Sequence, residues 1–284
     1  MQDDVIGHFV MEMIMPIVMK RLAVLAALLV LAACEGGGNE TGGQQPFTGN
    51  SLIQWDRSPS TVVFRTEVVG GNDEENFLAR NEIPLCTIYG DNRIVWVNDL
   101  GNFETQVLWD KVTDQQIQDY ISFLTVTQQI FSYDAGADLQ VPGVIQPVRE
   151  VIIVNVNGRI HRTDSFSSTE WPPGYFESIV NFCKQVSRAP VLFEPTGAWL
   201  SARSVDYNSA RPLQIWNADA SGLNLAEVAQ RGEPLWLTGD NLRILWNMIR
   251  TSSPQILFVD IDGNAFEVVL EVPGVHPTSP PAPQ

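Results

Sequence analysis

The sequence predicts an α+β fold, in which hairpins build antiparallel sheets and helices pack on one face. Short runs of alternating apolar and polar residues are joined in pairs by two- or three-residue turn sequences. Longer segments with apolar residues at helical spacing follow these pairs. Hairpins join antiparallel strands, and an antiparallel sheet with helices on one face is typical of the α+β class. A hydrophobic share of 44% supplies enough apolar surface for a packed core.

The first hairpin unit precedes a capped helix. Its strands are predicted at 62–68, 83–89, 93–97 and 103–109. Gly90-Asp91-Asn92 supplies the turn residues between the second and third strands. Thr113 or Asp114 is the expected N-cap of the helix. The predicted apolar face of this helix consists of Ile117, Tyr120, Ile121, Leu124 and Phe131.

A second unit repeats this arrangement. Strands at 148–156 and 159–164 flank Asn157-Gly158, a favoured two-residue hairpin turn. Pro172-Pro173 is expected to open the following helix, because proline is tolerated in the first turn. The apolar stripe of this helix consists of Phe176, Ile179, Val180, Cys183 and Val186.

The last third of the chain has shorter elements. Strands are predicted at 198–204, 213–216, 235–237, 256–261 and 265–270. A short helix is expected at 223–229, and Leu242, Leu245, Trp246 and Ile249 define a longer one. Asp262-Gly263 is interpreted as a type I′ turn between the last two strands. The segment from Pro273 onward is rich in proline and predicts an extended, unpacked tail at 274–284.

We expect two domains, a larger one at 51–190 and a smaller one at 191–273. Residues 189–197 hold two prolines and are typical of a boundary. A single continuous domain is the alternative. Residues 35–50 form a glycine-rich linker, since six of these sixteen residues are glycine.

An export signal is predicted at 1–33. Lys20 and Arg21 precede an unbroken apolar run of 12 residues, 22–33. As a helix this run spans about 18 Å, which is less than the roughly 30 Å of a hydrocarbon core. The alternative is a membrane anchor that extends back through 13–19, which would place both charges in the bilayer at roughly 2.5 kcal/mol or more each. The signal does not need residues 1–18, so the sequence also allows a translation start at Met15 or Met19.

The segment Leu31-Ala32-Ala33-Cys34 resembles the bacterial lipobox. The resemblance implies cleavage between Ala33 and Cys34 and covalent attachment of lipid, with palmitate as a label, to Cys34. It also implies an extracytoplasmic location in the cell envelope, anchored to a membrane by that lipid. Glu35 is not the residue that favours inner-membrane retention, so the final membrane stays open.

Residues 84–96, PLCTIYGDNRIVW, weakly resemble a hairpin of uncharacterised bacterial lipoproteins. In that pattern an apolar-Thr-Ile-Tyr-Gly-Asp-Gly run leads into the second strand. Asn92 stands here in place of the final glycine. The resemblance implies no activity.

The net charge of −16 argues against a nucleic-acid partner, which would require clustered Lys and Arg. It also argues against electrostatic adhesion to anionic lipid headgroups. Two cysteines besides Cys34 remain, Cys86 and Cys183. They form either a disulfide, as thiols outside the cytoplasm tend to do, or two separate buried thiols.

The strongest metal candidate is a calcium-loop mimic formed by Asp260, Asp262, Asn264 and Glu271. The glycine required at the sixth position is replaced by Ala265, and the flanks alternate as strands. We therefore favour a hairpin turn and expect no metal site. No cofactor other than the lipid is expected.

His161, Asp164 and Ser165 suggest a catalytic triad, but strand alternation sends His161 and Asp164 to opposite faces. His276 lies in the predicted tail. The carboxylates of 73–75 lie in a polar loop, where a solvated turn is the simpler interpretation. No catalytic residue is therefore assigned.

We expect a lipid-anchored lipoprotein that is more typical of a non-enzymatic binding or envelope protein than of an enzyme, with an unidentified protein or glycan partner. One alternative is an extracytoplasmic hydrolase that uses carboxylates or His161, which would have a deep polar pocket with two or more titratable side chains. Another is a carbohydrate-binding module, which would expose coplanar tryptophan rings.

Overall fold

The computed structural model describes residues 52–71, 77–136 and 145–283. Residues Asn50–Gln284 form one compact unit. The predicted signal peptide, the predicted lipidation site Cys34 and the predicted 35–50 linker lie outside the described residues, as do the carboxylates at 73–75. Among the described helices, none combines the length and the apolar character needed to cross a bilayer.

The structure confirms the α+β class, with a seven-stranded antiparallel sheet and a five-stranded mixed sheet. Sheet A has the order β6-β5-β1-β2-β3-β4-β7, and sheet B has the order β10-β8-β12-β11-β9. The strands of sheet A are β1 Val62–Gly71, β2 Cys86–Tyr89, β3 Arg93–Gly101, β4 Glu104–Lys111, β5 Gln146–Val156, β6 Arg159–Asp164 and β7 Val191–Leu192. Those of sheet B are β8 Ala198–Val205, β9 Leu213–Ile215, β10 Leu235–Leu237, β11 Leu257–Val259 and β12 Ala265–Glu271. The helices are α2 Asp114–Ser122, α3 Tyr175–Val186, α4 Ala218–Ser221, α5 Leu225–Arg231 and α6 Gly239–Arg250, with a π-helix at Phe123–Thr127 and a 3-10 turn at Ile130–Ser132.

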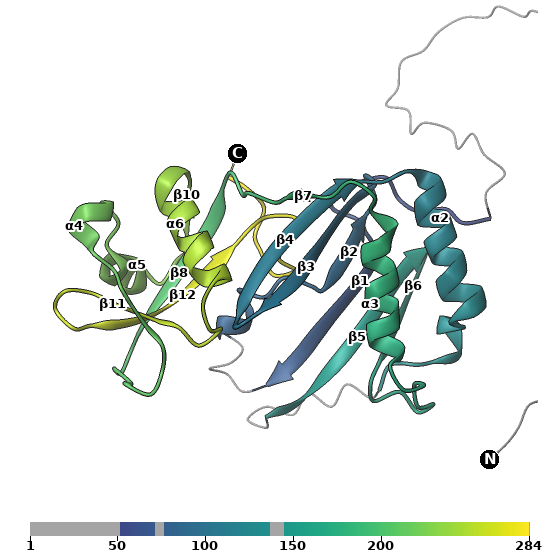
Figure 1. Cartoon of the computed structure of the whole chain (residues 1–284), viewed down its shortest axis with the longest axis horizontal. Helices are drawn as coiled ribbons and strands as arrows, with labels where there is room; N and C mark the ends of the chain where they lie inside the picture. The colour runs from purple at the N-terminus through teal and green to yellow at the C-terminus, as the bar shows by residue number, and fades with distance from the viewer. Residues whose placement is uncertain (1–51, 72–76, 137–144, 284) are drawn as a thin grey trace, which may run out of the picture. The chain divides into compact units, whose positions relative to one another are not determined.

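Helices α2 and α3 pack on one face of sheet A (Figure 1). Thr113 is the N-cap of α2, and it forms a capping box with Gln116. The predicted apolar stripe of α3 is buried throughout. The prediction that Phe131 lies on the apolar face of this helix is wrong. The helix changes to a π-turn at Phe123, and Phe131, in the later 3-10 turn, is 54% exposed.

The opposite face of sheet A contributes to a second core. Val95, Val97 and Val107 from sheet A belong to the same buried cluster as Leu200 and Phe266 from sheet B. Helices are therefore not the only cover of sheet A. Whether 51–190 folds independently of 191–273 stays a prediction.

Asn81 connects the turn before β2 to the end of the described chain. Its amide nitrogen donates to the Val268 carbonyl oxygen at 2.8 Å, and its amide oxygen accepts from the Leu270 N–H at 2.8 Å. The backbone oxygen of Asn81 lies 3.3 Å from Nε2 of His276. These contacts join residues 187 to 195 positions apart.

The C-terminal segment is packed at its start, which corrects the prediction of an unpacked tail for Val275 and His276, whereas residues 277–283 are mostly exposed. Val275 and His276 are 2% and 3% exposed. The Val272 N–H donates to Nδ1 of His276, so the neutral ring carries its proton on Nε2. Burial, and secondarily the charge of Arg250, lower the pKa of His276 to about 3. Proline content alone therefore does not reveal the packed start of this segment.

The three hairpin turns differ in backbone conformation. Asn157 and Gly158 both have positive φ, as a type I′ turn requires. Asn92 adopts φ 67°, a left-handed conformation that asparagine tolerates better than most residues. The type I′ assignment at Asp262-Gly263 is wrong, because only Gly263 has positive φ. The loop instead closes through the Asp260 N–H, which donates to the Asn264 carbonyl oxygen at 3.0 Å.

Candidate functional site

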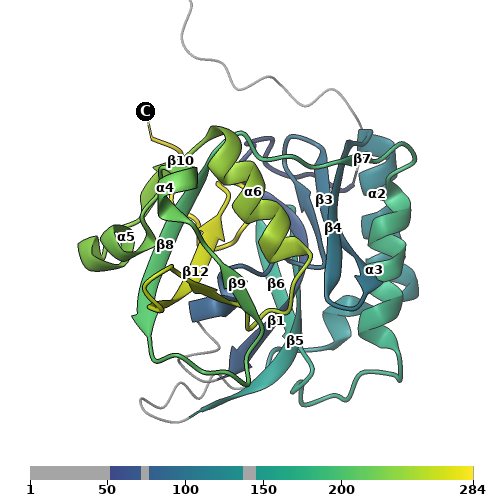
Figure 2. The same ribbon diagram turned by 60° about the vertical axis from the view of Figure 1, so that its left-hand side comes forward.

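The candidate site is a groove of about 770 Å³ between the edge of sheet A and α6. One wall consists of residues 104–107 of β4 and the segment 192–196, and the other wall is α6. Figures 1 and 2 show α6 on the β4 side of sheet A. The groove is thus formed where the chain leaves sheet A to begin sheet B.

Strand β7 is only two residues long, so part of the β4 edge has no strand beside it among the described residues. Within the described chain, β7 pairs with only two β4 residues, Leu108 and Trp109. The Phe193 N–H adds one further bond to the Val107 carbonyl oxygen at 2.8 Å. Continuing this register places Pro195 opposite Thr105, and proline has no N–H to donate. The sequence therefore ends the strand pairing at this point.

Aromatic side chains form the apolar part of the groove. The rings of Phe193 and Trp246 meet edge to face with centroids 6.0 Å apart. Leu192 and Ile244 also line the groove, and their side chains are 54% and 38% exposed. Exposed apolar side chains beside a concave surface are typical of a binding site.

Arg250 is the last residue of α6 and lines the groove. Burial lowers the pKa of its guanidinium to about 10, although the nearby Glu82 carboxylate opposes this shift. Burial likewise raises the pKa of Glu82. An Nη of Arg250 donates to the Asn81 backbone oxygen, while its buried Nε has no hydrogen-bond partner among the described residues. The Thr105 hydroxyl donates to the Arg250 carbonyl oxygen at 3.2 Å and ties β4 to α6.

The exposed charges of the groove are mostly acidic. Glu104, Glu194 and Asp240 line it together with Arg243. Asp240 pairs with Arg243 at 3.1 Å, but both side chains are more than three-quarters exposed, so this pair contributes little. Glu104 and Glu194 have no ion-pair partner within the described part of the chain.

The described lining of the groove holds few candidate nucleophiles. It contains no His, Cys, Ser or Lys among those residues. The Thr251 hydroxyl donates to the Asn247 carbonyl oxygen at 2.9 Å, as the Thr105 hydroxyl does to Arg250. These hydroxyls therefore lack the base that activation would require.

Comparison with family models, with curated proteins and with solved structures finds no match for this chain. The groove therefore has to be interpreted from its own residues.

The triad candidates do not assemble. Nε2 of His161 lies 2.9 Å from the Ile130 carbonyl oxygen, and the ring packs against Phe131. Asp164 is fully buried and accepts from the Gly136 and Phe166 N–H groups. The Ser165 hydroxyl instead accepts from the Glu150 N–H at 3.2 Å.

The calcium-loop candidates also separate. The Asp260 carboxylate accepts from the N–H groups of Asp262 and Asn264 and from the Asn264 amide. Glu271 is fully buried, pairs with Arg80 and accepts from the Thr278 hydroxyl at 2.6 Å. Among the described residues, no group of His, Cys, Asp and Glu could hold a metal ion.

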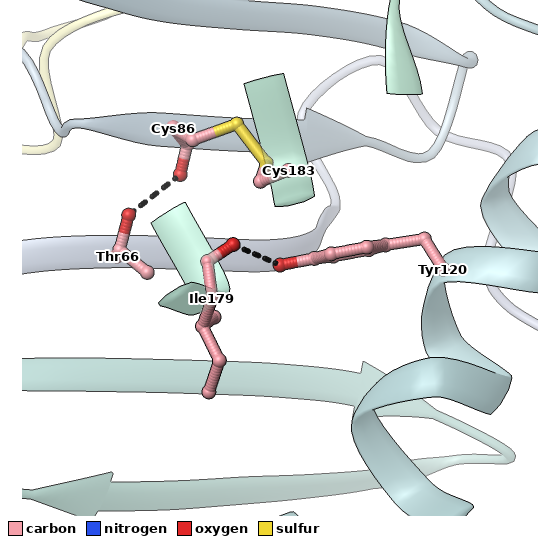
Figure 3. The surroundings of a disulfide bond; sticks show 5 residues. All are labelled: Thr66, Cys86, Tyr120, Ile179 and Cys183. Carbon is pink, nitrogen blue, oxygen red and sulfur yellow. Dashed lines mark hydrogen bonds between the residues drawn. A yellow bond between two sulfur atoms is a disulfide. The ribbon is translucent and has the colours of Figure 1, made fainter. Parts of the chain in front are cut away.

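Cys86 and Cys183 form a disulfide, with their Cα atoms 6.3 Å apart. The bond joins β2 to α3 across the first core, and both residues are fully buried (Figure 3). Nearby, the Tyr120 hydroxyl donates to the Ile179 carbonyl oxygen at 3.1 Å. Of the two alternatives for these cysteines, a disulfide or two separate buried thiols, the structure contains the disulfide.

The eight tryptophans all lie in the described residues, and none is exposed. The neighbouring rings of Trp199 and Trp236 are 66° apart in plane, so they form no flat platform. The feature that would favour a carbohydrate-binding module is therefore missing from these side chains.

Sequence reasoning missed the groove residues. Phe193 lies more than 50 positions before Trp246 and Arg250, which share α6, so no local sequence motif contains all three. The one available signal was Pro195, which marks the end of an edge strand.

Proposed function

We propose that this protein is a lipid-anchored, extracytoplasmic lipoprotein that binds a partner in the groove between β4 and α6. The lipobox-like ending at Cys34 and the short apolar run before it support the anchor. The observation that carries the binding role is the groove itself, about 770 Å³ in volume, which has aromatic and partly exposed apolar side chains among the polar and charged residues that line it.

The geometry favours binding over hydrolysis. A hydrolase of the kind considered above would bring titratable groups together, but His161 and Asp164 are engaged by separate backbone groups. The arrangement at the groove is instead apolar side chains beside a strand edge, which is a common form of recognition surface.

The anchor is tested with labelled palmitate in cells that produce the chain. The wild-type protein should retain label and sediment with membranes, whereas Cys34→Ser should lose both properties. A Cys34→Ser protein that stays in the membrane fraction would contradict the anchor.

The groove is tested by site-specific photo-cross-linking in the same cells. A photoreactive residue at Asn247, which lines the groove, should give at least tenfold more adduct than one at Ile215, an exposed position on β9 that does not line it. Equal yields from the two positions would contradict a binding role for the groove.

A further inference from the structure

The edge of β4 before Val107 has backbone groups that no described residue of β7 pairs with. The Val107 carbonyl oxygen points away from β3, because it accepts from Phe193 at 2.8 Å. Backbone groups two residues apart in a strand point the same way, so the N–H and C=O of Thr105 also face outward. Thr105 is paired to Asp99 of β3 on its other side, and β7 does not reach it within the described chain. The part of this edge that β7 and Phe193 leave unpaired runs over residues 104–106, about 10 Å.

The surroundings of this edge select the kind of chain that would pair with it. Side chains that alternate along an added strand would point toward Trp246 and Ile244 on one face. Glu104 and Glu194 lie at the same groove without ion-pair partners among the described residues, and the chain as a whole carries −16. Basic side chains on the ligand would therefore complement the site.

Exposed apolar side chains continue beyond the groove. Leu100 and Phe103, at the turn that leads into β4, are 48% and 64% exposed. Val191 at the other end of the edge is 52% exposed. Scattered apolar residues need no explanation, but these flank one strand edge at both ends.

We infer that the groove binds an extended, basic peptide segment of a partner protein by adding it as a strand to the edge of β4. The added strand takes the place that β7 vacates at Pro195, and its backbone pairs with Thr105. Apolar side chains at alternate positions contact α6, and Lys or Arg side chains meet Glu104 and Glu194. This inference rests on the proposed function, since it names the ligand of the same groove.

The test begins with a library of random heptapeptides panned against the full chain. The enriched peptides should combine alternating apolar residues with Lys or Arg. Their affinity is measured by fluorescence anisotropy of the labelled consensus peptide. Ile244→Lys should raise the Kd at least tenfold, whereas the matched control Ile215→Lys should leave it within twofold.

Backbone pairing is tested on the peptide, which leaves the protein unchanged. N-methylation of alternate residues on one edge of the peptide should raise the Kd at least tenfold, and N-methylation of the other edge should change it less than twofold. Hydrogen exchange at the Thr105 amide should slow at least tenfold on binding. A side-chain-only binder would show neither effect.

The preference of the groove for a basic peptide is tested with a double charge-reversal variant. Glu104→Lys combined with Glu194→Lys should raise the Kd at least tenfold in low salt, with a smaller effect at 0.5 M salt because exposed charges are screened. An unchanged Kd would overturn the basic character of the ligand.

The outcomes separate the two proposals. Peptide binding that is sensitive to Ile244→Lys but insensitive to N-methylation would overturn strand addition and leave the binding groove standing. Enriched peptides that ignore Ile244→Lys, or a library that yields no binder, would overturn strand addition. The cross-linking from Asn247 then decides separately whether the groove binds any partner.

Discussion

Removing the Cys86–Cys183 disulfide should destabilise the protein by about 4–5 kcal/mol. The bond closes a loop with a sequence separation of 97 residues, and the chain-entropy relation assigns that stabilisation to a loop of about this length. The perturbation is reduction of the wild-type bond, compared with the double variant Cys86→Ala and Cys183→Ala. Both sulfurs are fully buried, so the double variant also loses packing and should be the less stable of the two.

Urea denaturation in a Cys34→Ser background measures this effect, because that background leaves only the two paired cysteines. Reduction should lower the free energy of unfolding by several kcal/mol and increase the denaturant slope, since the uncrosslinked unfolded chain exposes more surface. For a unit of this size each kcal/mol corresponds to roughly 2–4 °C, so Tm should fall by about 8–20 °C.

Two results would refute this reasoning. One is a free energy of unfolding that differs by less than about 1 kcal/mol between oxidised and fully reduced protein. The other is alkylation of both thiols in unfolded protein that was never exposed to reductant, which would show that the bond does not form. Intact mass after alkylation distinguishes the two.

Three further changes test the packing of the second half and of the first hairpin. The buried His276 has its pKa lowered to about 3, whereas the unfolded chain takes up a proton below about 6.5. Stability should therefore fall as the pH drops from 6.5 toward 3, by up to about 1.4 kcal/mol per pH unit, and urea titrations of His276→Asn should show a shallower fall. Glu267 is 2% exposed and pairs with two arginines at 2.5 and 2.7 Å. In urea denaturation, Glu267→Ala should therefore lower the free energy of unfolding by roughly 3–5 kcal/mol, and Glu267→Gln should lower it less. Equal losses from the two variants would contradict the ion-pair argument. A Cβ on Gly90 would lie 2.1 Å from a backbone oxygen, so Gly90→Ala should lower the free energy of unfolding by about 3 kcal/mol. Gly101 has open space around it but a positive φ, so Gly101→Ala should lower it by about 1 kcal/mol. Thermal unfolding of both variants checks this difference.

Local patterns were sufficient to predict most elements of the fold. The stripe of α3 and the Asn157-Gly158 hairpin depend on residues close in sequence, so periodicity and turn chemistry identify them directly. The α2 helix was less well predicted at its end. Helical spacing placed Phe131 on the buried face, but the π-turn that begins at Phe123 changes the phase of the helix before that residue.

Features that depend on tertiary contacts could not be predicted from sequence. His276 is buried because Asn81 and Val272 supply hydrogen bonds, and neither contact has a signature near the proline-rich segment. The parallel pairing of β9 with β11 likewise joins segments with no common motif. The candidate site belongs to this class, since β4 and α6 come together through the shared second core and the Thr105–Arg250 hydrogen bond, which join segments far apart in sequence.

The long reach of the Asn81 contacts affects the order in which the protein can mature. Among the described residues, its amide group bonds to Val268 and Leu270, which follow it by nearly two-thirds of the chain length. A polypeptide delivered with its N-terminus first would therefore leave the Asn81 amide without these two partners until β12 is made. During that interval the second core would also lack Phe266, Val268 and Leu270 of β12, and an incomplete core is the kind of surface that proteases and chaperones recognise.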